Sequence, residues 1–189
     1  IWVARRTSAG WSAPVEVANG EQGDGERLPS WNPVLFQPAN GPLQLFYKVG
    51  PDPSRWWGLV SASSDHGRNW SAPARLPRDI LGPAKNKPIE LADGVVLSPS
   101  SSEQGAWRVH VERNPGPDRS WQRIDLVDGS GDFRAIQPAL LRYPSGRIQL
   151  LARSREDRIV QSWSDAAGRT WGPLSPTALP NPNSGIDAV

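Results

Sequence analysis

The fold is decided by a turn that occurs twice, as Ser63-Ser64-Asp65-His66-Gly67-Arg68-Asn69-Trp70 and as Ser164-Asp165-Ala166-Ala167-Gly168-Arg169-Thr170-Trp171. In such a turn the Asp can accept hydrogen bonds from nearby backbone N–H groups, and the Gly tolerates a positive φ. Weaker copies end at Trp11 and Trp121, so the four tryptophans follow one another at steps of 59, 51 and 50 residues. A motif that recurs at a period of about 50 residues indicates a repeat architecture.

Each of these turns closes a unit in which the pattern predicts four short strands. A polar residue and a proline open the first strand, at Pro33, Pro88 and Pro138. Hairpin signals then lead into the second strand, at Asn40-Gly41, Asp93-Gly94 and Ser145-Gly146. Four strands per repeat are typical of a propeller blade, and no helical periodicity interrupts them. The sequence therefore predicts an all-β fold, a β-propeller of four-stranded blades, over a two-sheet sandwich, which has no reason to repeat a turn at this period.

The repeats also give expected boundaries. A blade ends within residues 1–18, three blades span about residues 27–77, 85–127 and 135–180, and the next starts near 184. The chain begins at Ile1 without a Met and stops in what resembles the start of a strand. We therefore expect residues 1–189 to be a single incomplete propeller domain, with about three to four blades of a longer protein that has six when complete.

Composition excludes several classes of site. There is no cysteine, so disulfides and Cys-ligated zinc are excluded, and two histidines are too few for a His-rich metal site. We expect no metal and no cofactor, because no cofactor motif is present. A net charge of +2 gives no nucleic-acid footprint. No apolar run approaches the ~20 residues that span a bilayer. The oligomeric state is not decided by the sequence.

Propeller topology sorts the loops between two faces. In an up-and-down blade the turns between strands 1 and 2 and between strands 3 and 4 lie on one face, here called the turn face. The loops between strands 2 and 3 and the links between blades lie on the opposite face, here called the site face. Charged, amide and aromatic side chains gather there, as recognition of sugar hydroxyls and carboxylates requires. The candidate substrate-binding residues are Arg27, Asn32, Arg55, Trp56, Lys87, Glu103, Arg153, Arg155, Asn183 and Asp187.

The tryptophan turns resemble the Asp-box, or BNR repeat, Ser-x-Asp-x-Gly-x-Thr-Trp, with Asn69 at the Thr position of one copy and one extra residue between Asp165 and Gly168 in the other. The whole chain is similar to the bacterial "predicted neuraminidase" group of sialidase-like proteins. The segments that carry this likeness are Trp31-Asn32-Pro33-Val34-Leu35-Phe36, Tyr47-Lys48-Val49-Gly50, Ser54-Arg55-Trp56-Trp57-Gly58, Lys85-Asn86-Lys87-Pro88 and Asn181-Pro182-Asn183-Ser184-Gly185-Ile186-Asp187. The resemblance implies the fold more firmly than the activity. The Asp-box residues themselves are expected to be structural.

The resemblance also implies two site residues. Sialidases carry an Arg-Ile-Pro motif whose Arg binds the sugar carboxylate, and Arg27-Leu28-Pro29 stands in that place with Leu for Ile. They carry an Asp acid/base on the following loop, where this chain has Asp52, between two prolines. The family's Tyr nucleophile and its Glu partner come from later blades. Tyr47 and Tyr143 do not fit the nucleophile, because both are predicted in strands or turns.

A second titratable cluster contains Glu103, His110, Glu112 and Arg113. Strand alternation places His110 and Glu112 on the same side of their strand. Such a pair can act as a general base, but a satisfied structural pair is the favoured interpretation.

Three functions follow as hypotheses. The leading one is a glycoside hydrolase of exo-sialidase (neuraminidase) type that releases a terminal, in some cases acidic, sugar from glycans. The alternatives are another glycan-active propeller enzyme, such as a polysaccharide lyase with a His or Tyr base, and a non-catalytic propeller that binds glycans. The expected partner in each case is a glycan or oligosaccharide. A periplasmic or secreted location is expected for such a protein.

Overall fold

A computed structural model describes residues 1–116, 120–127 and 133–189. Every regular element in these residues is a β-strand. The strands are β1 (Trp2–Val3), β2 (Arg6–Thr7), β3 (Gly10–Trp11), β4 (Val15–Glu16), β5 (Ser30–Phe36), β6 (Leu43–Val49), β7 (Trp57–Ser63), β8 (Ala74–Arg75), β9 (Ile89–Glu90), β10 (Val96–Ser102), β11 (Arg108–Asn114), β12 (Gln122–Asp125), β13 (Ala135–Arg142), β14 (Ile148–Ser154), β15 (Arg158–Ser164) and β16 (Ser175–Pro180). None of the described residues forms a helix that is long and apolar enough to cross a membrane.

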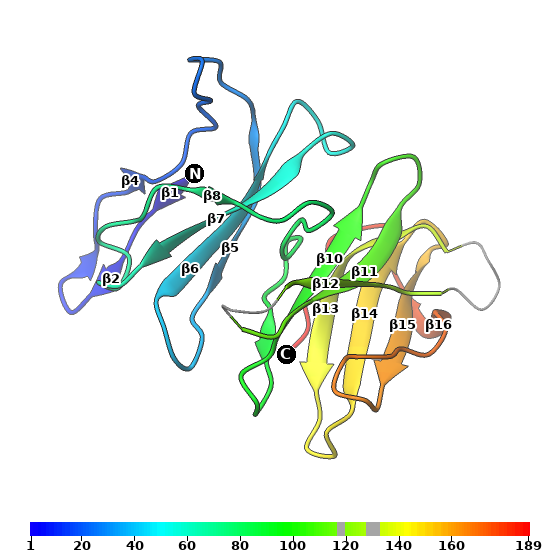
Figure 1. The fold of residues 1–189 in the computed structure, drawn as a ribbon. Helices are drawn as coiled ribbons and strands as arrows, with labels where there is room; N and C mark the ends of the chain where they lie inside the picture. The colour runs from blue at the N-terminus through cyan, green and yellow to red at the C-terminus, as the bar shows by residue number, and fades with distance from the viewer. Residues whose placement is uncertain (117–119, 128–132) are drawn as a thin grey trace.

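Three four-stranded antiparallel sheets follow one another along the chain, β5–β8, β9–β12 and β13–β16, each with its strands in sequence order (Figure 1). They are called blade 1, blade 2 and blade 3 below. Two short strand pairs, β1 with β4 and β2 with β3, precede them. The predicted all-β propeller of four-stranded blades is thus confirmed. The domain boundaries and a total of six blades stay predictions, and residues 117–119 of the expected second blade lie outside the described residues.

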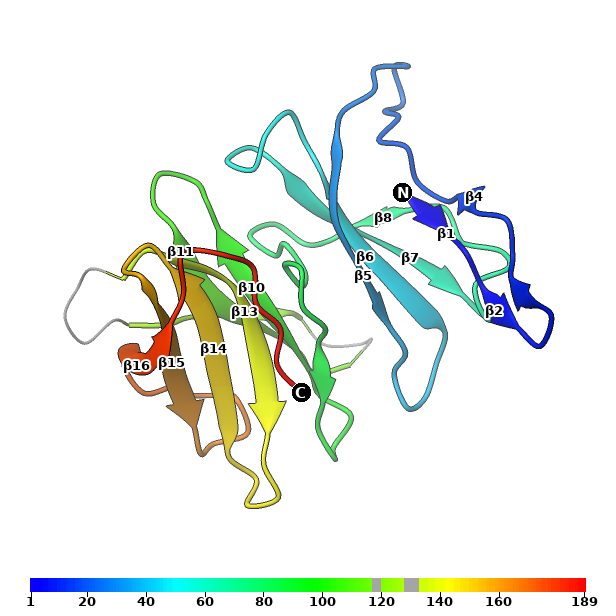
Figure 2. The same cartoon turned by 180° about the vertical axis from the view of Figure 1, so that it is seen from behind.

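The loops divide between two ends of the blades, as the topology requires. In Figure 1 the β5–β6, β9–β10 and β13–β14 hairpins point downward, together with the turn from β15 to β16, and form the turn face. The loops from β6 to β7 and from β10 to β11 point upward, on the site face (Figure 1). Figure 2 shows from behind that the chain after β16 crosses the site-face end of blades 2 and 3. The links between blades therefore share this face with the loops between second and third strands.

The first Asp-box turn is held by its carboxylate. Asp65 Oδ1 accepts the backbone N–H groups of Arg68 at 3.0 Å and Asn69 at 2.9 Å, and the hydroxyl of Ser63 at 2.8 Å. The Asn69 backbone and side-chain hydrogen bonds, followed by Ser63, hold the pKa of Asp65 well below its usual range. The predicted capping role is confirmed for Asp65.

The second turn works differently, because it contains one more residue. Asp165 Oδ1 accepts from Arg147 Nε at 2.8 Å instead of capping the turn. Ser164 Oγ accepts the Gly168 N–H at 3.0 Å, as Ser63 Oγ accepts the Gly67 N–H at 2.8 Å. The prediction that Asp165 caps the backbone is therefore wrong, and the serine hydroxyl is the feature that both turns share.

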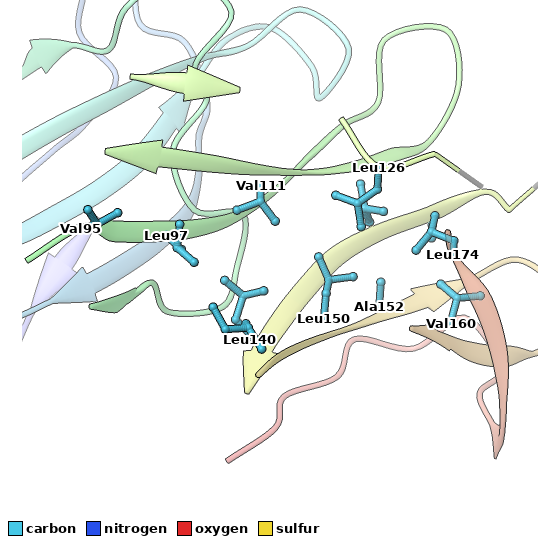
Figure 3. Packing of buried hydrophobic residues seen from close by; sticks show 12 residues of the cluster. Val95, Leu97, Val111, Leu126, Leu140, Leu150, Ala152, Val160 and Leu174 are labelled. Carbon is cyan, nitrogen blue, oxygen red and sulfur yellow. The ribbon is translucent and has the colours of Figure 1, made fainter. Parts of the chain in front are cut away.

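The tryptophans pack into the seams on either side of the blades. Trp70 joins the cluster between blade 1 and the N-terminal segment, and Trp121 packs against the cluster between blades 1 and 2. Trp171 packs on the core between blades 2 and 3, which Figure 3 shows filled by aliphatic side chains from β10, β11, β13, β14 and β15. Burying such apolar surface is the main favourable contribution to joining one blade to the next.

The tight fit of the second turn gives a test. Gly168 has a φ of 73°, and a Cβ at this position meets Leu97 Cδ1 of blade 2 at 2.4 Å, where Leu97 is fully buried. Gly146 has a φ of 86° with open space around it. We expect Gly146→Ala to lower the free energy of unfolding by about 1–2 kcal/mol through backbone strain alone. Gly168→Ala is expected to cost about 1–3 kcal/mol more through overpacking.

Urea and thermal unfolding of both variants would measure the difference. Equal losses for Gly146→Ala and Gly168→Ala would contradict the close contact between the blade 3 turn and blade 2.

Candidate functional site on the loop face

The loop of blade 1 ties Asp52 into a turn. Its carboxylate accepts the Ser54 hydroxyl at 2.6 Å and backbone N–H at 2.9 Å, and pairs with Arg55 Nε at 2.8 Å and Nη2 at 2.6 Å. The Ser54 hydroxyl, followed by Arg55, lowers the pKa of Asp52 to about 2. At neutral pH this carboxyl is ionised, whereas a general acid must carry its proton when substrate binds. The acid/base role of Asp52 stays a prediction, and the geometry adds a turn-forming role.

Two tryptophans stand beside this turn. The rings of Trp56 and Trp31 meet edge to face, with centroids 6.1 Å apart at 65°, and Trp31 Nε1 donates to Gly50 O at 3.2 Å. Arg27 lies on the preceding link, where its only ion pair in the described part of the chain is with Glu21 at 3.6 Å. Arg27 and Asp52 are thus on the same face, but no hydrogen bond between described residues joins them.

The loops of blades 2 and 3 build a second group around Trp107. The guanidinium carbons of Arg155 and Arg153 lie 4.1 Å and 5.3 Å from the Trp107 ring centroid. Arg153 Nη1 also donates to Asn183 O at 2.9 Å. Partial burial raises the pKa of Glu103, and the charges of Arg153 and Arg155 act against that rise. We call Glu103, Trp107, Arg153, Arg155 and Asn183 the Trp107 cluster.

The Trp107 cluster has unused hydrogen-bonding capacity. Arg153 Nε and Asn183 Oδ1 are buried, and neither has a hydrogen-bond partner among the described residues. Unpaired buried polar atoms are uncommon in native proteins and need an explanation, such as a ligand or an ion. Sequence reasoning missed Trp107; its only signal was an aromatic residue where the loop of blade 2 enters the third strand.

The first strands of blades 1 and 3 carry unusual backbone at their site-face ends. Asn32 and Gln137 have φ values of 46° and 54°, each directly before a proline and within a register shift of the strand pairing. Lys85 and Asn183, on the later links, have φ values of 79° and 59°. Positive φ in residues other than Gly costs free energy and is concentrated at functional sites.

Side chains from the links lock this strained backbone. Asn86 Nδ2 donates to the carbonyl groups of Gln137 at 3.1 Å and Pro138 at 3.0 Å, and Lys85 Nζ donates to Ile186 O at 2.6 Å. Lys87 and Asp187 are exposed. The Lys87 side chain makes no hydrogen bond or ion pair with any of the described residues. The links thus bring blade 2, blade 3 and the C-terminal segment together.

A buried polar clamp joins blades 1 and 2 below this face. The Glu112 carboxylate accepts the N–H groups of Leu81 and Gly82, each at 2.7 Å. Lys48 Nζ donates to the carbonyl groups of the same segment, to Gly82 O at 3.3 Å and to Pro83 O. Lys48 and Glu112 are fully buried. We call Lys48, Glu112 and the Leu81–Pro83 backbone the polar clamp.

Burial governs the charges in the clamp. It lowers the pKa of Lys48 to about 7, against the opposing influence of Glu112. His110 Nε2 lies 3.0 Å from Glu112 Oε1 and is also fully buried. His110 and Glu112 are therefore a structural pair, as the favoured interpretation held, since a general base must reach substrate. The role of Lys48 in the clamp was not predicted from the sequence, although a lysine near the end of an apolar strand was the available signal.

Comparison with known proteins defines the class. All of residues 1–189 match the family described as BNR repeat-like domain, and the chain therefore belongs to that family. The sialidase-like character of this family agrees with the Asp-box turns and the four-stranded blades of the chain. No curated protein sequence matches the chain.

Three solved structures show the shared fold. A Dyadobacter fermentans protein of unknown function aligns with a TM-score of 0.70 at 15% identity, over 90% of this chain and 56% of its own. The Hadza microbial sialidase Hz136 aligns with a TM-score of 0.75 at 14% identity, over 97% and 42%. A Trypanosoma rangeli sialidase in complex with the inhibitor DANA aligns with a TM-score of 0.63 at 16% identity, over 87% of this chain and 31% of its own. This chain thus spans about half or less of the length of the structures that it matches.

The polar clamp yields a stability prediction. Glu112→Gln keeps the shape of the side chain but leaves one oxygen for two N–H groups, so one backbone donor of the Leu81–Gly82 segment loses its acceptor. We expect the free energy of unfolding to fall by about 1–3 kcal/mol. Urea unfolding of the full-length protein would measure this loss, with Glu26→Gln on the exposed link as the matched control. A Glu112→Gln variant as stable as the control would contradict the clamp.

Proposed function

We propose that this chain forms part of a glycoside hydrolase of exo-sialidase type, which releases a terminal acidic sugar at the site face. The observation that carries the proposal is the Trp107 cluster, in which two guanidinium groups face one indole ring with a single carboxylate nearby. Arg binds carboxylates through paired hydrogen bonds, and Arg155 and Arg153 place two guanidinium groups beside Trp107. Membership of the BNR repeat-like family and the fold shared with proteins titled as sialidases support the same activity.

Arg27 is proposed to bind the sugar carboxylate. Its pairing with Glu21 spans 3.6 Å between two largely exposed side chains, which contributes at most about 1 kcal/mol. A substrate carboxylate can therefore replace Glu21 at little cost. Arg153 and Arg155 are proposed to contact a further anionic or hydroxyl group of the same substrate.

Asp52 is proposed to donate the proton to the departing oxygen. Its pKa of about 2 is set by the Ser54 and Arg55 contacts within the turn itself. A bound substrate carboxylate and the exclusion of water both raise the pKa of a neighbouring carboxyl group, and both arise only in the complex. Arg55, which holds the ionised form of Asp52, is proposed to move to the substrate when Asp52 takes up its proton.

The other candidate residues are proposed to position the sugar. Trp56 offers an aromatic surface, and amide or charged groups offer partners for hydroxyls, from Asn32, Lys87, Glu103, Asn183 and Asp187. The nucleophile is proposed to come from outside residues 1–189. Tyr47 is buried in the core of blade 1, and Tyr143 donates its hydroxyl to Gln149 at 2.7 Å on blade 3, so neither is placed to attack.

A glycan-binding propeller without hydrolysis is the second candidate. The low pKa of Asp52 favours it, because a permanently ionised carboxylate recognises hydroxyls but donates no proton. A lyase that uses His110 as its base is disfavoured by the complete burial of this side chain.

The full-length protein should be tested on fluorogenic glycosides that include an α-sialoside, with Asp52→Ala and Arg27→Ala as variants. We expect turnover of the sialoside, a fall in kcat of about 10²–10⁴-fold in Asp52→Ala through loss of proton transfer, and a raised KM in Arg27→Ala. Arg169→Ala, on the exposed turn face, is the control and should behave as wild type.

If the protein releases the sugar of another glycoside but no sialic acid from the sialoside, the sialidase assignment would be rejected. Turnover that survives Asp52→Ala would remove its acid/base role, and silence on every glycoside would favour the binding propeller.

A further inference from the structure

A cleft lies between blades 1 and 2 on the outer part of the site face, and it borders the candidate site at Trp56 and Glu103. Its volume is about 390 Å³, within the range of small-molecule sites. The side chains that shape it are those of Trp56, Trp57, Arg75, Arg78, Glu103 and Arg123. We propose that this inter-blade cleft is a second saccharide-binding site, and that it takes a sugar unit that carries a carboxylate or sulfate. The proposal rests on the proposed function only in that one glycan is taken to reach both sites.

Aromatic side chains give the cleft a surface for a sugar ring. Trp56 and Trp57 are both partly exposed along its wall. Trp56 is held edge to face against Trp31, so its orientation is fixed before a ligand arrives. Rigid indole rings offer a large amphipathic contact area at a low entropy cost, which suits the apolar and hydroxyl-bearing sides of a sugar.

The charges of the cleft favour an anion. Arg75 stacks over the Trp57 ring at 4.7 Å and has no ion pair with any described residue. Arg78 approaches Asp79 only at 3.9 Å, with both side chains largely exposed, so this contact contributes little. Arg123, in contrast, is held by Asp125 at 2.7 Å. Two guanidinium groups are therefore available for a carboxylate or sulfate, against Asp79 and Glu103 as the acidic side chains of the lining.

The floor of the cleft is rigid. It is formed in part by Ile80 and Leu81, and the Leu81 N–H is bound by Glu112 of the polar clamp at 2.7 Å. The same segment rests directly on β7 at Gly58, where a Cβ would lie 2.4 Å from Leu81 O. A floor fixed in this way loses little conformational freedom when a ligand binds, which favours affinity.

Direct binding tests the inter-blade cleft without any need for turnover. The full-length protein should be titrated by isothermal calorimetry with tetragalacturonate, a heparin-derived tetrasaccharide and neutral cellotetraose. We expect one or both acidic probes to bind at least about tenfold more tightly than cellotetraose, and the double variant Arg75→Ala/Arg78→Ala to weaken this binding by about tenfold or more, a loss of about 1.4 kcal/mol. Preference for tetragalacturonate assigns carboxylate as the recognised group, and preference for the heparin fragment assigns sulfate.

Two further variants sharpen the result. Arg78→Glu changes a side chain that is 96% exposed, so it should fold normally and weaken acidic binding further. Arg68→Ala/Arg169→Ala removes two arginines from the turn face and should bind as wild type. Turnover of a glycoside with a small fluorescent aglycone should be unchanged in Arg75→Ala/Arg78→Ala, because neither arginine belongs to the candidate site and a small substrate does not extend to them.

Acidic binding that survives Arg75→Ala/Arg78→Ala and Arg78→Glu, or equal binding of the neutral probe, would overturn the proposal. If the wild-type protein cleaves no glycoside but binds the acidic probes, and these variants lose that binding, the cleft proposal would stand. Only the proposed hydrolase activity would then be rejected.

Discussion

Gly82 is held through both its backbone N–H and its backbone C=O in the interior, and much of the site face depends on this arrangement. Glu112 of blade 2 binds its N–H, and Lys48 of blade 1 binds its C=O. Burying two ionisable groups is costly unless each makes good hydrogen bonds, and here Glu112 accepts two backbone N–H groups and Lys48 donates to two backbone carbonyl groups. The link between the two blades is thereby fixed at one point beside the apolar cluster that Ile80 joins. From that point the chain runs into Lys85, Asn86 and the first strand of blade 2.

The two faces of the propeller divide structural and functional roles. On the turn face the repeated hydrogen bonds of Ser63 and Ser164, together with the tryptophans, satisfy local backbone and fill the seams between blades. On the site face the strained residues Asn32 and Gln137 and the unpaired atoms of Arg153 and Asn183 are concentrated. Such departures from low-energy structure require a scaffold that is stable elsewhere, which the repeated turns supply.

The fold could be predicted because its signals are local. A Gly hairpin, an Asp-box turn and a terminal tryptophan each lie within a few residues, and their period indicated the blades. The division of loops between faces followed from topology alone. The polar clamp could not be predicted, since Lys48 and Glu112 lie far apart in the chain and meet only on the Leu81–Gly82 backbone.

Other errors have equally specific causes. The extra residue in the second Asp-box turn sends Asp165 to Arg147, a change that the motif does not encode. The role of Trp107 could not be predicted, because its two arginine neighbours come from the next blade. The positive φ values of Asn32 and Gln137 run against the restriction that a following proline imposes, so no local rule indicates them. Contacts across blades account for most of what the sequence left open about the site.

A crystal structure of the full-length protein with a bound sialic acid would test the central claim, that the site face holds the reacting sugar, most directly. We predict that the sugar lies over the loops between second and third strands, with its carboxylate paired to Arg27 and its ring within reach of Asp52. A sugar bound at the turn face, beside the Asp-box turns, would contradict this account.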